Sequence, residues 1–122
     1  MGVPLYEAKA ELFKKLCHPA RIRVLELLCE RDHAVHELLD KIDIEPSNLS
    51  QQLAVLRTSG LVHSRRERAQ VLYTLSVPEI RDLLLAGRRI LGSLLDAQAR
   101  ERSELQEGLT SEELTIPQRA TR

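Results

Sequence analysis

The chain has 122 residues, and its 18 basic and 18 acidic side chains cancel. This length indicates a single domain, and the balanced charge excludes a strong overall attraction to nucleic acid or to a membrane surface. No apolar run reaches the roughly eighteen residues that a membrane helix needs, and the N-terminus lacks the pattern of a secretory signal. Cys17 and Cys29 lie in apolar helical patterns that suit reduced thiols rather than a disulfide framework. We therefore expect a cytoplasmic protein with no membrane partner.

Apolar residues at helical spacing predict three helices in the first third of the chain. The first runs over about 5–17. The second begins at Pro19, because the first turn of a helix leaves the N–H that proline lacks unbonded anyway. His18 is expected to cap or pack at this junction, and the second helix should turn inward Ile22, Leu25, Leu28 and Cys29. A third, short helix should do the same with Val35, Leu38, Leu39 and Ile42.

A fourth helix follows the turn at 43–47 and carries on one face Leu49, Leu53 and Leu56. Gly60 suits the end of this helix, because glycine readily adopts the left-handed conformation found there. The β-prone stretches 61–64 and 71–75 then flank a charged tip and predict a hairpin. Two short helices, a tight turn between them and a hairpin therefore follow one another directly.

Pro78 opens a final helix whose apolar face continues for about four turns, from Ile80 to Leu95. Beyond this helix the sequence becomes acidic and loses its apolar face. We therefore assign residues 1–103 to one domain and expect 104–122 to be an acidic, disordered tail. The predicted fold is mainly α with a small β-hairpin, in the order helix, helix, helix, helix, hairpin, helix.

Charge is distributed unevenly along this balanced chain. Residues 26–45 carry a net charge of −5, whereas residues 46–76 carry +3 from four arginines and one glutamate. A basic segment within a neutral chain is typical of a local surface that faces phosphates. The alternative is an arginine cluster that is merely solvated.

Two short helices followed by a hairpin with a basic tip are typical of a winged helix-turn-helix. Short polar side chains lie off the leucine face near the start of the fourth helix: Ser47, Asn48, Ser50, Gln51 and Gln52. Their amides can pair with base edges, and their hydroxyls can bind phosphate oxygens. Four arginines are candidates to hold the flanking DNA backbone: Arg57 on the helix, and Arg65, Arg66 and Arg68 at the hairpin tip. The alternative is an ordinary polar helix face beside a solvated hairpin.

Two longer stretches make this pattern specific. Phe13–Leu28 resembles the opening signature of the ArsR-type bacterial repressors, and Ser47–Val62 resembles their recognition helix, S-x-x-S-x-H-L-x-x-L-x-x-A-G-L-V. Gln52 stands where this family commonly has histidine, and Ser59 where it commonly has alanine. The resemblance spans roughly residues 12–95. It implies a homodimer, built from the first and last helices, that places two recognition helices on one face of the DNA.

The apolar surface of the last helix agrees with a dimer, because it exceeds what one small domain needs for its own core. The expected interface residues are Phe13, Leu84, Leu91 and Leu95. The expected partners are therefore a second copy of the chain and a double-stranded DNA operator.

Members of this family commonly release DNA when a metal or a thiol oxidant binds. The paired cysteines of one known site align with Ala34-Val35-His36-Glu37, and the last helix lacks the histidine that the other common site needs. His33 and His36, three apart in an acidic segment, remain as candidates for a transition metal such as zinc or nickel. The alternative is two exposed histidines at a helix start. Both cysteines are expected to lie in the core rather than to form a redox pair.

The sequence offers no catalytic site, since it lacks a Gly-rich phosphate loop, a His-Glu-x-x-His motif and a Cys-x-x-Cys motif. We expect a sequence-specific transcriptional regulator, a repressor that binds a palindromic operator as a homodimer and responds to an effector or a metal. The alternative is a winged-helix protein-interaction module that binds no DNA and docks through its acidic tail. Three arginines within four hairpin positions favour DNA, because closely spaced positive charges suit a row of phosphates.

Overall fold

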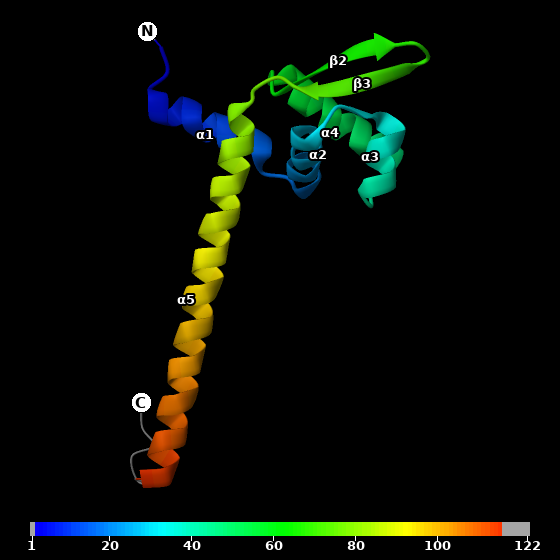
Figure 1. Cartoon of the computed structure of the whole chain (residues 1–122). Coiled ribbons are helices and arrows are strands. Elements are labelled where there is room, and N and C mark those ends of the chain that lie inside the picture. The colour runs from blue at the N-terminus through cyan, green and yellow to red at the C-terminus, as the bar shows by residue number, and fades with distance from the viewer. Residues whose placement is uncertain (1, 116–122) are drawn as a thin grey trace. The chain divides into compact units, whose positions relative to one another are not determined.

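Four helices and a small sheet make up most of the first 84 residues in the computed structural model, which describes residues 2–115 and the side chains of 2–109. The helices are α1 (Leu5–Leu16), α2 (Pro19–Glu30), α3 (Val35–Lys41) and α4 (Pro46–Thr58) (Figure 1). All four helices predicted from the apolar spacing are confirmed.

Local backbone chemistry sets where these helices begin and end. Pro19 and Pro46 each stand at a helix start, where a missing N–H costs nothing. His18 caps α2, because its Nδ1 accepts a hydrogen bond from the backbone N–H of Ala20 at 3.1 Å. Gly60 follows α4 with a φ of +84°, which glycine adopts without strain. The predicted roles of His18 and Gly60 are therefore confirmed.

Three antiparallel strands form the sheet in the order β1-β3-β2. They are β1 (His33–Ala34), β2 (Val62–Glu67) and β3 (Gln70–Leu75). The sequence did not predict β1, because two residues are too few to show an alternating pattern. It pairs with β3 through His33 opposite Tyr73 and thereby joins the hairpin to the start of α3.

The hairpin of β2 and β3 is longer than the predicted strands at 61–64 and 71–75. Its pairing continues through the charged tip as far as Glu67 opposite Gln70. Charged side chains do not interrupt this pairing, because both faces of the tip are exposed and the side chains remain in water. Arg68 and Ala69 form the turn, and Arg68 has the positive φ of 59° that two-residue hairpin turns require.

The core is aliphatic and draws on every helix and on the hairpin. Its most deeply buried residues include Val24, Leu25, Leu27, Leu38, Leu49, Leu56 and Val62. Ile22 is 36% exposed, so its predicted inward position is wrong. The buried face of α2 is instead set by Ala20, Val24 and Leu27, at spacings of four and three, and Ile22 lies off this face.

The last helix, α5 (Glu79–Thr115), belongs to both of the compact units into which the chain divides, 1–84 and 85–122. Within the first unit, Ile80 is buried against the core. Of the tail expected over 104–122, residues 104–115 continue α5 and residues 116–122 lie outside the described residues. No described helix combines the length and the apolar character needed to cross a membrane.

Candidate nucleic-acid interface

Helix α4 has one buried face and one exposed face. It packs against α2 and β2, and the hairpin lies beside it (Figure 1). Its leucines are buried, whereas its opposite side is exposed and carries Ser47, Ser50, Gln51, Ala54, Arg57 and Thr58. These six residues, the α4 strip, follow one another at helical spacing and form a continuous band. The sequence predicted four of them, Ser47, Ser50, Gln51 and Arg57, as DNA contacts.

Gln52 does not belong to the α4 strip, although the sequence placed it among the base contacts. Its side chain is buried, with 8% exposed, and its Oε1 accepts a hydrogen bond from Arg21 Nε at 2.9 Å. Its Nε2 donates to Asn48 Oδ1, also at 2.9 Å. Gln52 lies three residues after Leu49 and four before Leu56, so its spacing already indicated the core side of the helix. Gln52 is therefore enclosed by the protein and hydrogen-bonded to both Arg21 and Asn48.

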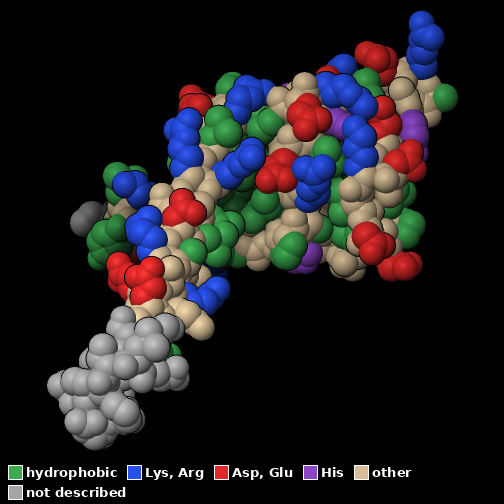
Figure 2. All heavy atoms as spheres, turned by 60° about the horizontal axis from the view of Figure 1, so that its bottom comes forward, with side chains coloured by type: hydrophobic (Ala, Val, Ile, Leu, Met, Phe, Trp, Pro, Cys, Tyr) green, Lys and Arg blue, Asp and Glu red, His purple; other side chains and the backbone are tan. Residues whose placement is uncertain are grey.

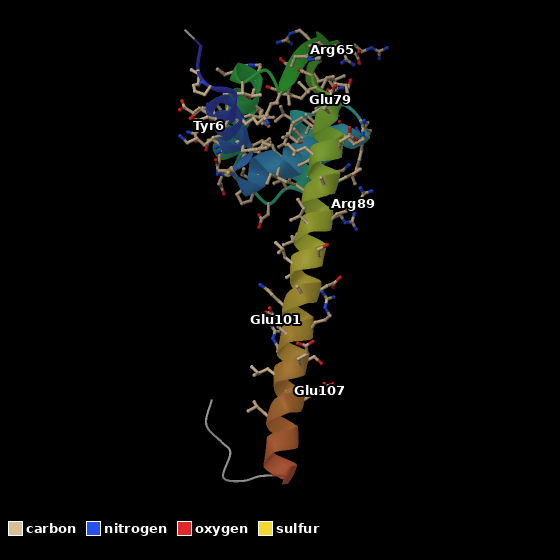
Figure 3. The ribbon with its side chains drawn as sticks, turned by 90° about the vertical axis from the view of Figure 1, so that its left-hand side faces the viewer. Tyr6, Arg65, Glu79, Arg89, Glu101 and Glu107 are labelled. Atoms are coloured by element: carbon tan, nitrogen blue, oxygen red, sulfur yellow. The ribbon has the colours of Figure 1, made fainter. Side chains whose placement is uncertain are left out.

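Arg65 is bound within the protein, although it was expected to contact phosphates. Its Nη1 donates to Asp32 Oδ2 at 2.8 Å and to Thr74 Oγ1 at 3.0 Å, and its Nε lies 3.6 Å from Glu67 Oε2. Partial burial raises the pKa of Asp32, but the hydrogen bonds from Arg65 and Thr74 and the charge of Arg65 outweigh this and leave it below its ordinary value. Arg65, labelled on the hairpin in Figure 3, therefore anchors the hairpin to the segment before β1.

Three arginines on the α4 strip and the hairpin carry charge that no acidic side chain of the described residues pairs with. Arg57, Arg66 and Arg68 are exposed and form no ion pair with any residue that the structure describes. Across the face shown in Figure 2, basic and acidic side chains are interspersed. The end of α4 and the hairpin thus carry exposed positive charge that no described acidic side chain pairs with, in the segment whose net charge is +3.

The structure does not bring His33 and His36 together as a metal-binding pair. His33 is fully buried in β1, with Nδ1 2.8 Å from the carbonyl oxygen of Arg31 and Nε2 3.4 Å from Lys41 Nζ. A lysine ammonium can only donate, so Nε2 accepts and Nδ1 donates to the carbonyl. His36 is exposed on α3, and within the described residues no group of three or more metal-ligating side chains is placed to hold an ion.

The acidic segment around these histidines shapes the start of α3. Glu37 Oε1 accepts a hydrogen bond from the backbone N–H of Ala34 at 2.8 Å, and Glu37 Oε2 lies 3.1 Å from Arg31 Nη1. The backbone hydrogen bond, helped by the charge of Arg31, holds the pKa of Glu37 below its ordinary value. The carboxylate of Glu37 therefore caps α3 and tethers its start to Arg31.

The two cysteines lie in different environments. Cys17, at the end of α1, is exposed, so its predicted place in the core is wrong. Cys29 on α2 is half-buried, and burial raises the pKa of its thiol. Its backbone carbonyl accepts a hydrogen bond from Arg81 Nη2, which ties the end of α2 to the start of α5.

Apolar side chains that the core does not use are exposed on α1 and, separately, on α5. On α1, Phe13 is 47% exposed. On α5, Leu91 and Leu95 are 57% and 54% exposed, and charged side chains such as Arg89 and Glu101 also project from this helix (Figure 3). Leu84 differs from the other expected interface residues, because it packs against the core of the first unit.

Sequence comparison decides the family. Residues 18–64 match the family model described as "Bacterial regulatory protein, arsR family". The HTH-type transcriptional regulator Rv0081 of Mycobacterium tuberculosis is 48% identical over 106 residues, which cover 86% of this chain and 93% of the relative. The chain belongs to the ArsR family. The resemblance predicted from the sequence is thus confirmed, and this ArsR-family chain is a transcriptional regulator rather than an enzyme.

Solved structures share the fold of this ArsR-family regulator. The crystal structure of Rv0081 matches it with a TM-score of 0.73 at 49% identity, covering 80% of this chain and 99% of Rv0081. The transcriptional repressor BigR from Xylella fastidiosa matches with a TM-score of 0.66 at 39% identity, covering 70% and 87%. The winged helix-turn-helix domain of Mb0332 from Mycobacterium bovis matches with a TM-score of 0.66 at 24% identity, covering 76% and 86%. The predicted winged helix-turn-helix fold is confirmed.

Proposed function

We propose that this ArsR-family regulator is a homodimeric repressor that binds a palindromic operator with α4 in the major groove. The α4 strip carries the proposal. Its Ser47, Ser50 and Gln51 are exposed and make no side-chain hydrogen bond to any residue within the described range. The major groove, about 12 Å wide, admits one helix and displays the donor and acceptor atoms that such side chains can bind.

The contacts divide by their chemistry. Gln51, in the second turn of α4, reads a base edge, because its amide offers both a donor and an acceptor. Ser47 and Ser50 bind phosphate oxygens near the helix start, where free backbone N–H groups also point outward. Arg57 and the hairpin arginines Arg66 and Arg68 neutralise phosphates without regard to sequence.

A symmetric dimer explains the exposed apolar residues of α1 and α5, which water would otherwise cover. A two-fold axis places two α4 helices against half-sites about 34–36 Å apart, one turn of DNA, so the operator is palindromic. The name of the relative BigR, a transcriptional repressor, supports repression. Because His33 is enclosed, the proposal assigns no metal to His33 and His36.

The test begins with the full chain and a pool of randomised duplexes, from which bound DNA is selected and sequenced. Fluorescence anisotropy then measures affinity for a selected and a scrambled duplex over a series of salt concentrations. We expect a palindromic consensus and an affinity that falls by about 0.9 in log K per log salt for each phosphate contact. A chain that shifts no duplex at low salt is an interaction module, and the proposal fails. Transcription from a promoter that carries the consensus should fall when the protein is added, and a rise would make it an activator.

A further inference from the structure

A line of hydrogen bonds runs from the end of α1 to the first turn of α4. Arg21, on α2, donates from Nη1 to the backbone carbonyl of Lys15 at 3.0 Å and from Nε to Gln52 Oε1 at 2.9 Å. Gln52 in turn donates a hydrogen bond from Nε2 to Asn48 Oδ1 at 2.9 Å. These hydrogen bonds connect three helices and end at Asn48, whose side chain is half-buried beside the α4 strip.

The direction of every bond in this line is fixed by Arg21. A side-chain amide can usually exchange its oxygen and nitrogen by rotating half a turn. A guanidinium has only donors, so the atom of Gln52 that faces Arg21 must be the oxygen. The nitrogen of Gln52 then faces Asn48, whose oxygen must accept. Asn48 is consequently left with its Nδ2 group, two N–H donors that bond to no residue in the described part of the chain.

We infer that Arg21 and Gln52 set the hydrogen-bonding polarity of Asn48, which makes Asn48 a reader of acceptor atoms and above all of guanine. The inference rests on the proposed function, since it assumes that α4 lies in the major groove. Guanine presents two adjacent acceptors there, N7 and O6, which suit the two N–H groups of Nδ2. Bidentate pairing with adenine needs the amide oxygen to accept from N6, and in this protein that oxygen is turned toward Gln52.

Arg21 and Gln52 are positioning residues, because neither lies on the α4 strip and both act through Asn48. Gln52 is buried, and the guanidinium of Arg21 is occupied by Lys15 and Gln52. The sequence assigned Asn48 and Gln52 the same role in base contact. In the structure the two differ: Asn48 is half-buried, with N–H groups that bond to no described residue, whereas the buried Gln52 decides which atoms of Asn48 remain free.

The substitution Gln52→Glu reverses the polarity while keeping the shape of the side chain. The new carboxylate still accepts from Arg21 but can only accept from Asn48, so the amide of Asn48 must rotate and turn Oδ1 outward. Asn48 then offers an acceptor, which suits the amino groups of adenine and cytosine. The matched control is Gln70→Glu, which adds the same charge at an exposed position of β3 to which no DNA contact is assigned.

The experiment uses the full chain and the pool of randomised duplexes, with circular dichroism to show that each variant folds. The variant Asn48→Ala first identifies the base pair whose preference depends on Asn48. At that position we expect guanine for the wild type and for Gln70→Glu. For Gln52→Glu we expect adenine or cytosine, with the ratio of affinities changed roughly tenfold or more. Arg21→Met should relax the preference, because both orientations of the amides then become available.

Three results would overturn the inference while leaving the proposed function intact. They are selected duplexes whose preferences all survive Asn48→Ala, a wild-type preference for adenine or cytosine at the Asn48 position, and equal base preferences at that position for Gln52→Glu and Gln70→Glu. If the wild type selects no duplex, the proposed function fails and the inference fails with it.

Discussion

Most leucines of the first unit are buried or partly buried, whereas most leucines of the second unit that the structure describes are exposed. In the first 84 residues, leucines such as Leu25, Leu49 and Leu56 are buried completely. On α5 beyond residue 84, the large apolar side chains are mostly half or more exposed, as Leu91 and Leu105 are. The buried leucines therefore stabilise one protomer, whereas the exposed leucines of α5 are available to the proposed second copy. Polar side chains within the first unit also differ from one another. Gln52 and Arg65 are hydrogen-bonded to other described side chains of the protein, whereas Gln51 and Arg66 are exposed and are not.

The largest expected effect is on folding. Leu56→Ala removes a fully buried side chain and should lower the free energy of unfolding by about 2–5 kcal/mol, through lost burial and the cavity left behind. Urea denaturation measures this loss. Ile22→Ala, at an exposed position on α2, should cost much less. Equal losses would contradict the assignment of the core.

The next effect separates folding from association. Leu91→Glu would place a carboxylate in the proposed apolar interface and should raise the dimer dissociation constant by on the order of a hundredfold. Sedimentation velocity should show monomers that remain helical and bind the selected duplex weakly. Ser93→Glu adds the same charge two residues along α5, on another side of the helix, and should stay dimeric. A dimer that survives Leu91→Glu would place the interface elsewhere.

A smaller effect distinguishes base reading from phosphate binding. Gln51→Ala should cost about 1–3 kcal/mol of binding free energy on the selected duplex and little on a scrambled one. Anisotropy titrations on both duplexes measure the difference. Equal losses on the two duplexes would mean that Gln51 reads no base.

The hairpin offers a comparison between two neighbouring arginines. Arg66→Ala should reduce the salt slope of DNA binding by about one unit, because it removes one phosphate contact. Arg65→Ala should change the slope less, since Asp32 and Glu67 already balance that charge, and should instead lower the free energy of unfolding. A larger slope change at Arg65 than at Arg66 would mean that Arg65 leaves Asp32 when DNA binds.

The smallest expected effect is an acid-dependent loss of stability. The pKa of Glu37 lies below its ordinary value in the folded chain. Its contribution to the free energy of unfolding is therefore complete above the unfolded pKa of about 4.3 and is lost as the pH falls through the folded pKa. The free energy of unfolding should therefore decrease with acidification over this range. Glu37→Gln should flatten that decrease, and an unchanged acid dependence in this variant would contradict the role of the carboxylate.

The start of α2 and the end of α4 could be predicted because local chemistry determines them. Pro19 and Gly60 mark ends through their own backbone preferences, and His18 caps through a residue two positions away. The strand β1 could not be predicted, since its pairing with β3 depends on residues about forty positions apart. Ile22 was misplaced because apolar character alone does not say which side of a helix meets the core.

The candidate site was predicted in outline but not in the state of each side chain. The α4 strip follows from helical spacing, and the same spacing placed Gln52 on the buried side. Arg65 could not be assigned from sequence, because its partner Asp32 is 33 residues away. The enclosure of His33 likewise depends on Lys41 and on the sheet. Composition shows which groups are present, whereas tertiary contacts decide which of them remain available.

The most direct test of the central claim is the stoichiometry of the complex between the full chain and a labelled copy of its selected duplex. Sedimentation equilibrium at several salt concentrations gives both the mass of this complex and the salt dependence of its formation. The account predicts two protomers per duplex and an affinity that falls steeply as salt rises. A complex with a single protomer, or an affinity that does not respond to salt, would contradict it.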